Sequence, residues 1–92
     1  MLVRWTEPAV NDLTHICDYA KQRFDAAQAR RTALAIFESI ESLRSFPHKG
    51  RLGRRPNTRE LSIPKLPFLA IYRIRNSTIE VNRILHGAQK WP

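Results

Sequence analysis

The stretch that decides the fold is Pro67-Phe-Leu-Ala-Ile-Tyr-Arg-Ile-Arg-Asn-Ser-Thr-Ile-Glu-Val-Asn-Arg-Ile-Leu-His-Gly-Ala-Gln-Lys-Trp-Pro92. β-Branched and aromatic residues are enriched on both sides of the pair Asn76-Ser77, which favours a tight turn. The stretch therefore predicts a β-hairpin with strands over residues 68–75 and 78–85. One histidine, His86, stands where the second strand is expected to end.

Side chains of a strand alternate between the two faces of a sheet. In the first strand, one face is expected to carry Phe68, Ala70, Tyr72 and Ile74, and the other Leu69, Ile71, Arg73 and Arg75. In the second strand, Ile79, Val81, Arg83 and Leu85 are expected to alternate with Glu80, Asn82, Ile84 and His86. Arginines that emerge beside apolar neighbours predict a concave surface with a basic rim.

Upstream of the hairpin, two helices are expected after a short strand at residues 2–5. Thr6 is a suitable N-cap for the first helix, and Asp25 with Gln28 forms a capping-box pattern for the second. Intervals of three and four residues define the two apolar stripes. The first contains Val10, Leu13, Cys17, Ala20 and Phe24, with Ile16 beside them, and the second Ala29, Ala33, Ile36, Phe37, Ile40 and Leu43. Phe46-Pro47 is expected to stop the second helix.

The connection over residues 47–58 is a loop by composition, since it contains glycines, prolines and basic residues. Its glycines, Gly50 and Gly53, are typical of a flexible turn more than of a phosphate cradle. A short strand is expected at residues 59–63, after which Pro64 and Pro67 turn the chain. The order is thus β-α-α-β-β-β in a single domain spanning residues 1–92. We expect an α+β fold in which a helical hairpin packs on one face of a small, mainly antiparallel sheet.

The charge of this 92-residue chain is concentrated in its second half. Residues 1–43 carry five bases against six acids, a net of −1, and residues 44–92 carry eleven bases against two acids, a net of +9. Such asymmetry on a small domain predicts an anionic partner, either nucleic acid or an acidic protein segment. The alternative is that the charge serves only solubility.

Composition excludes several classes of protein. One cysteine, Cys17, rules out an internal disulfide framework and a multi-cysteine metal site, and its place in the helical stripe predicts a packed thiol. Apolar runs are shorter than the roughly 20 residues of a membrane helix, and no signal peptide is recognisable. We therefore expect a cytoplasmic protein without membrane contact, metal ion or cofactor.

The residues available for chemistry suit phosphate binding better than catalysis. Arginine binds phosphate bidentately and stays charged at any useful pH. The candidate contacts for a phosphate or a target are Arg51, Arg54, Arg55, Arg59, Arg73 and Arg83. His86 is the candidate acid or base of a metal-free nuclease, or else a hydrogen-bonded residue at a strand end. A second proton-transfer group is missing, since Tyr72 is expected in the core and Glu60 has no assigned face.

Together these segments resemble the RelE/ParE superfamily of toxins from bacterial type II toxin–antitoxin modules. The resemblance covers essentially the whole chain. It rests on Thr6-Glu-Pro-Ala9, Phe46-Pro-His-Lys-Gly-Arg-Leu-Gly-Arg-Arg55, Thr58-Arg-Glu-Leu61, Ile71-Tyr-Arg73 and Ile84-Leu-His-Gly87 in this order and spacing. It implies a compact toxin neutralised by a small antitoxin encoded with it, in a complex that commonly represses its own operon.

The resemblance implies two possible targets. Members that resemble RelE cleave mRNA on the ribosome without metal, and members that resemble ParE inhibit DNA gyrase. The nuclease branch often has an arginine three residues before the tyrosine of the third strand, where this chain has Leu69. That branch also tends to keep a tyrosine or basic residue beside the C-terminal histidine, where Gly87 and Ala88 stand. The gyrase-inhibitor interpretation is therefore preferred, with the RelE-like endonuclease as the alternative.

Two further expectations concern partners. An amphipathic antitoxin segment with acidic side chains would match the basic half of the chain, and its binding should weaken with salt. The third functional hypothesis is a basic domain with no toxic activity that serves only as a partner for the antitoxin.

Overall fold

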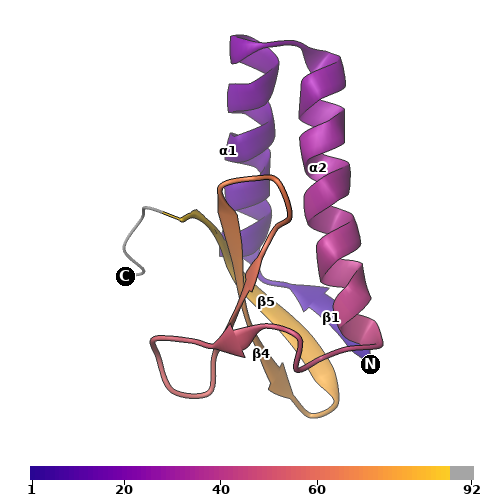
Figure 1. Ribbon diagram of the computed structural model, residues 1–92, viewed down its shortest axis with the longest axis vertical. Helices are drawn as coiled ribbons and strands as arrows, with labels where there is room; N and C mark the ends of the chain where they lie inside the picture. Colours follow the sequence, from indigo (N-terminus) through magenta and orange to yellow (C-terminus); the bar gives the residue numbers. More distant parts are fainter. Residues whose placement is uncertain (88–92) are drawn as a thin grey trace.

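The computed structural model of the chain describes residues 1–87. The elements are β1 (Leu2–Trp5), α1 (Glu7–Arg23), α2 (Ala26–Glu41), a short 3-10 helix (Ser42–Arg44), β2 (Arg51–Leu52), β3 (Arg59–Ser62), β4 (Phe68–Arg75) and β5 (Thr78–His86). The two helices stand side by side as an antiparallel hairpin, and the strands lie across the lower part of the molecule (Figure 1). The expected α+β fold is confirmed, with one strand more than the sequence predicted.

The sheet has the strand order β1-β5-β4-β3-β2. All neighbouring pairs are antiparallel except β1 and β5, which run parallel from Leu2 opposite Thr78 to Trp5 opposite Val81. The N-terminal strand therefore lies beside the C-terminal strand, and the two ends of the described chain are joined through the sheet. The additional strand, β2, lies inside the segment that composition identified as a loop. It pairs Arg51 with Glu60 and Leu52 with Arg59.

Both helices begin at the expected caps. The Thr6 hydroxyl accepts a hydrogen bond from the Ala9 N–H at 3.3 Å, and the Asp25 carboxylate accepts one from the Gln28 N–H at 2.7 Å. The side-chain Oε1 of Gln28 accepts from the Arg31 guanidinium at 2.8 Å, so the Asp25 half of the capping box is the half that forms. These side chains satisfy backbone donors that the first turn of a helix leaves without partners.

The turn between β4 and β5 is built by Asn76 and Ser77, as expected. Their φ angles are 53° and 59°. A two-residue hairpin turn with positive φ at both positions matches the twist of the flanking strands, and asparagine tolerates this conformation well. The turn sets the register, so Arg75 pairs with Thr78 and Ile74 with Ile79.

The alternation expected along β5 is wrong beyond Val81, because the strand contains a β-bulge. Tyr72 pairs with Val81 but Ile71 pairs with Arg83, which leaves Asn82 as an extra residue. As a result Ile84 faces the helices together with Val81, whereas Leu85 packs on the opposite face. Without the bulge, these two side chains would exchange faces.

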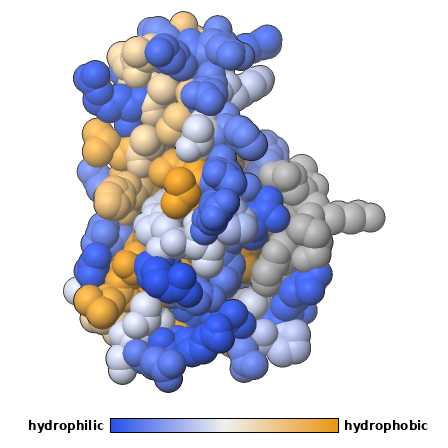
Figure 2. Space-filling model, turned by 180° about the vertical axis from the view of Figure 1, so that it is seen from behind, coloured by the Kyte–Doolittle hydropathy of each residue, from blue (hydrophilic) through white to orange (hydrophobic). Residues whose placement is uncertain are grey.

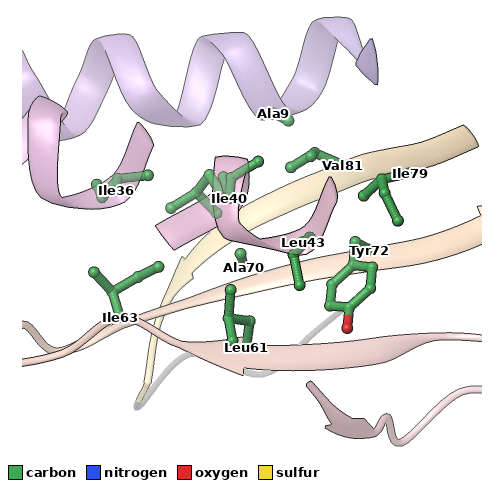
Figure 3. Packing of buried hydrophobic residues seen from close by; sticks show 11 residues of the cluster. Ala9, Ile36, Ile40, Leu43, Leu61, Ile63, Ala70, Tyr72, Ile79 and Val81 are labelled. Carbon is green, nitrogen blue, oxygen red and sulfur yellow. The ribbon is translucent and has the colours of Figure 1, made fainter. Parts of the chain in front are cut away.

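The main core lies between the helical hairpin and one face of the sheet. Figure 3 shows Ile36, Ile40 and Leu43 above the strand residues Leu61 and Tyr72. On the opposite face of the sheet, Leu69, Ile71 and Leu85 form a second, small apolar cluster. Burial of this apolar area is the main favourable contribution to folding.

Part of each expected helical stripe is not buried. Along the first stripe the buried or half-buried positions are Ala9, Leu13, Ile16, Cys17 and Ala20, whereas Val10 and the C-cap residue Phe24 are exposed. In α2 the sheet covers Ile36 and Ile40, and Phe37 is exposed. A residue next to a core position lies about 100° around the helix, so it points away from the sheet.

Tyr72 fastens the segment before β2 to the sheet. Its hydroxyl donates to the Pro47 carbonyl at 2.8 Å and accepts from the Gly50 N–H at 2.9 Å. A Cβ at Gly50 would lie 2.8 Å from the Tyr72 ring, so only glycine fits this contact. Gly50 therefore serves close packing and is not the flexible turn residue that the sequence suggested.

Replacing Tyr72 by phenylalanine tests this contact. The Tyr72→Phe variant leaves the buried Gly50 N–H and the Pro47 carbonyl without their partner, which is expected to lower the free energy of unfolding by about 1–3 kcal/mol. Urea unfolding followed by circular dichroism measures the change. Tyr19→Phe is the matched control, because the Tyr19 side chain is exposed on α1. Equal stability of the two variants would show that the Tyr72 hydroxyl contributes nothing.

Candidate functional site

An open cleft of about 620 Å³ lies on the face of the sheet that the helices leave uncovered, at β1, β5 and β4. Because Ile79 and Val81 point into the core, Glu80 between them points to the opposite face. The cleft is lined by Arg4, Thr6, Pro8, Arg55, Pro56, Thr58, Arg73, Glu80, Asn82 and Arg83. It thus contains four guanidinium groups and one carboxylate.

The centre of the cleft is an ion-pair row across three strands. Glu80 on β5 lies opposite Arg4 on β1 and opposite Arg73 on β4. Its carboxylate forms ion pairs with Arg4 and with the Arg73 Nε, the latter at 2.9 Å. The Asn82 amide donates a further hydrogen bond to it at 3.0 Å. The carboxylate therefore orients two arginines whose side chains remain partly exposed.

These contacts keep Glu80 ionised. The hydrogen bond from Asn82 is the largest influence that lowers its pKa; burial acts in the opposite direction, and the hydrogen bond from Arg73 and the charges of Arg73 and Arg4 outweigh that effect. The pKa of Glu80 consequently lies below its ordinary value. At neutral pH the cleft retains an excess of positive charge.

Asn82, the extra residue of the bulge, also lines the cleft. Within residues 1–87, its Oδ1 is the buried side-chain polar atom that has no hydrogen-bond partner. A buried acceptor without a partner costs free energy, so Asn82 is a place where the bulge lowers the stability of the sheet.

Arg83 lies at the end of the cleft where β1 stops and α1 takes its place along β5. The Asp12 carboxylate accepts two hydrogen bonds from Arg83, at 2.7 and 3.0 Å, and one from the Ile84 N–H at 2.9 Å. The hydrogen bond from Arg83 to Asp12 raises the pKa of the arginine. Asp12 thus satisfies the strand edge left open by β1, and two N–H donors of the Arg83 guanidinium are used inside the protein.

Two of the loop arginines are held by Glu60. This carboxylate is buried and accepts from the Arg51 guanidinium at 3.1 Å and from the Arg54 N–H at 3.2 Å. Burial would raise the pKa of Glu60, but these hydrogen bonds and the charges of Arg54 and Arg51 together lower it. Glu60 therefore ties the loop to β3, and its face is now defined: it lies opposite Ile71, on the face that carries the cleft.

Arg55 of the loop and Arg59 of β3 lie on opposite sides of the sheet. Arg55 lines the cleft beside Arg73. Arg59 lies opposite Tyr72, on the helix-facing side, and donates to the Gly50 carbonyl at 2.8 Å and the His48 carbonyl at 3.3 Å. Of the six arginines that the sequence proposed for phosphate or target contact, the structure brings Arg55, Arg73 and Arg83 together.

His86 does not join this group. It lies opposite Phe68 at the end of β5, and their rings meet edge to face with centroids 6.0 Å apart. Because Ile84 faces the helices and Leu85 the other side, His86 lies on the helix-bearing face, away from the arginine cleft.

Tyr72 is wholly buried, and burial raises the pKa of its hydroxyl. Leu69 is part of the small apolar cluster and supplies no charge.

Sequence reasoning missed Arg4 and Asp12 as parts of this site, and it assigned no role to Glu80. Arg4 stands between Val3 and Trp5, and this alternation in a short strand is the one signal that it faces away from the core. Its partner Glu80 is 76 residues away along the chain, so their pairing depends on the parallel register of β1 and β5.

The ion-pair row makes a pH-dependent contribution to stability. The folded-state pKa of Glu80 is below the unfolded value near 4.5, so its contribution is complete above that pH and is lost as the pH falls through the folded pKa. We expect Glu80→Gln to lower the free energy of unfolding by about 1–3 kcal/mol at pH 7. The stability of this variant should also fall less steeply than that of the unmodified chain between pH 5 and pH 3, the range in which Glu80 takes up its proton.

Urea unfolding at a series of pH values measures both effects. Asp18→Asn, on the exposed side of α1, removes a carboxylate away from the cleft and serves as the control. An acid transition in Glu80→Gln as steep as that of the unmodified chain would show that Glu80 is not the titrating group.

A protein family and several known proteins are similar to this chain over most of its length. The family model described as the ParE toxin of the type II toxin–antitoxin system parDE matches residues 3–91. The putative toxin Y4kP of Sinorhizobium fredii is 33% identical over 90 residues, covering 98% of this chain and 92% of that protein. Toxin RelE2 of Caulobacter vibrioides is 36% identical over 87 residues, covering 95% and 96% of the two chains.

A solved structure, the chromosomal ParDE toxin–antitoxin system of P. aeruginosa, superposes with a TM-score of 0.87 at 27% identity and covers 94% of this chain and 95% of that chain. The sheet topology, the similar toxins and the family match over residues 3–91 all indicate the same family. The chain belongs to the ParE toxin family of the RelE/ParE superfamily and is the toxin of a type II toxin–antitoxin system.

Proposed function

We propose that this toxin inhibits growth by binding DNA gyrase, without chemistry of its own. The observation that carries the proposal is the composition of the open-face cleft, which offers guanidinium groups and no imidazole, phenol or thiol among its described lining residues. The match to the ParE family model and the likeness to a ParDE structure support the same target class.

A metal-free ribonuclease requires more than positive charge. It needs a base for the 2′-hydroxyl, an acid for the leaving oxygen and cations for the charge that develops on phosphorus. His86 lies on the other face of the sheet from Arg73, and Tyr72 uses its hydroxyl to hold Gly50 and Pro47. Glu80 is ionised and bound by two arginines. The groups that would transfer protons are therefore not assembled around the cations.

The second candidate function is ribosome-dependent cleavage of mRNA, which two observations support. Two relatives from Caulobacter vibrioides carry the names toxin RelE2 and toxin RelE1, and each is at least 33% identical to this chain. The basic second half of the chain would also suit an RNA backbone. In this alternative, the arginines of the cleft bind the message and His86 transfers a proton.

The cognate antitoxin is the partner that the toxin–antitoxin assignment implies. We propose that an acidic, amphipathic segment of the antitoxin contacts the basic half of the chain and blocks target binding. We place the inhibited toxin in the cytoplasm, where gyrase and the ribosome are located. Within residues 1–87, none of the helices has the length and apolar composition to cross a membrane.

A supercoiling assay with purified gyrase tests the main proposal. We expect Arg4→Gln/Arg73→Gln to weaken inhibition about tenfold, which corresponds to about 1.4 kcal/mol. Glutamine preserves a donor for Glu80 while it removes the charge. The control Lys21→Gln/Arg23→Gln removes the same net charge from the exposed end of α1 and should stay within about twofold of the unmodified toxin.

The same preparations in a translation extract distinguish the two targets. Intact message together with inhibited supercoiling supports the gyrase proposal. Cleaved message, with activity lost on the order of 10²–10⁴-fold in His86→Ala, would establish the nuclease instead. Normal supercoiling and intact message, together with normal growth after induction without the antitoxin, would leave a non-toxic binding domain.

Antitoxin binding should depend on ionic strength. Exposed charges separated by more than about 8 Å are largely screened at physiological salt and more strongly above it. We expect the dissociation constant of the toxin–antitoxin complex to rise by about tenfold or more between 0.1 and 0.5 M salt, measured by titration calorimetry. An affinity that is independent of salt would contradict the electrostatic part of the proposal.

A further inference from the structure

The face of α2 that points away from the sheet carries an apolar stripe without a covering element. Arg30, Leu34, Phe37 and Glu41 follow each other at intervals of four, three and four residues. At 3.6 residues per turn these positions fall within about 60° of one another on the helix. The spacing is that of the contact positions in a two-helix coiled coil.

The two central residues of this stripe are large and exposed. Leu34 is 51% and Phe37 is 45% accessible, and both lie near the middle of α2. Figure 2 shows apolar side chains gathered along the side of the molecule that α2 forms, with hydrophilic residues around them. Trp5 meets Phe37 edge to face, with ring centroids 6.3 Å apart, and so extends the apolar surface toward β1.

The charges that flank these two residues have opposite signs at the two ends. Arg30 and Arg31 precede the apolar pair, and Glu38 and Glu41 follow it. Within residues 1–87, neither Arg30 nor Glu38 forms an ion pair inside the chain. Glu41 pairs with Arg44 at the surface, where such a pair contributes little free energy.

This pattern is complementary to itself when the helix is reversed. An antiparallel second α2 places its acidic end beside the basic end of the first, and its apolar pair against the other apolar pair. We propose that α2 docks on α2 of a second copy of this chain about a two-fold axis. In the proposed register, Arg30 faces Glu41 of the partner subunit and Leu34 faces Phe37 of the partner subunit.

The sign change along the stripe favours a second copy over another occupant. A uniformly acidic segment, such as the one proposed for the antitoxin, would match Arg30 and Arg31 but would repel Glu38 and Glu41. A two-fold contact also uses one patch for both partners, which is the common arrangement in homodimers. Because α2 lies on the covered side of the sheet, such a pair leaves both arginine clefts open.

Sedimentation equilibrium of the full-length chain, with a charge-exchange cycle, tests the contact. Arg30→Glu and Glu41→Arg each place like charges opposite one another and should lower the association constant about tenfold. The double variant Arg30→Glu/Glu41→Arg pairs the exchanged charges again and should return to within about threefold of the unmodified chain. Circular dichroism checks that each variant folds.

A disulfide experiment tests the register. In a Cys17→Ser background, mixed Leu34→Cys and Phe37→Cys chains should oxidise mainly to the mixed dimer, because these two positions face each other in the antiparallel pair. Either cysteine variant oxidised alone should give several-fold less cross-linked dimer than the mixture.

Three results would overturn the proposal. The first is a chain that stays monomeric at every concentration. The second is a dimer whose association constant is unchanged by the single exchanges. The third is preferred cross-linking of Leu34→Cys with itself, which would contradict the proposed antiparallel register. Charge exchanges that weaken antitoxin binding but leave self-association unchanged would assign the stripe to the antitoxin.

Discussion

Asn82 is inserted into β5 opposite the step from Ile71 to Tyr72, and both faces of the sheet depend on this extra residue. Before the bulge, Ile79 and Val81 point into the core and Glu80 points to the open face. After it, Ile84 returns to the core, so His86 lies on the helix side. One inserted residue therefore separates the histidine from the arginines, since the side-chain period of a strand is two.

The open face depends in turn on a parallel contact between the two ends of the chain. β1 extends the sheet beyond β5 and adds Arg4 to the row that contains Glu80 and Arg73. Where β1 ends, Thr6 and Asp12 continue along the same edge: the Thr6 N–H donates to the Val81 carbonyl, and Asp12 accepts from the Ile84 N–H. The start of α1 therefore closes a strand edge that would otherwise expose unpaired backbone groups. The cleft forms at this junction.

The two carboxylates of the basic half have equivalent roles. Glu60 holds Arg51 and the Arg54 backbone, and Glu80 holds Arg4 and Arg73. Each is buried and has a pKa below its ordinary value. Arginines arranged around a buried anion have fewer conformations to lose on binding, so the surface is preorganised for a partner. A basic surface of this kind is suited to the recognition of an anionic partner.

The sequence by itself determined the local elements: the Thr6 and Asp25 caps, the Asn76-Ser77 turn, the two helices and the alternating faces of β4. Each depends on residues a few positions apart, where side chain and backbone interact directly. Resemblance to the toxin superfamily also followed from the order of these segments. Only the tertiary structure decided the bulge at Asn82, strand β2, the Arg4–Glu80 pair and the face of His86. These features depend on pairing between distant strands, and a shift of one residue, which leaves composition unchanged, moves every following side chain to the other face.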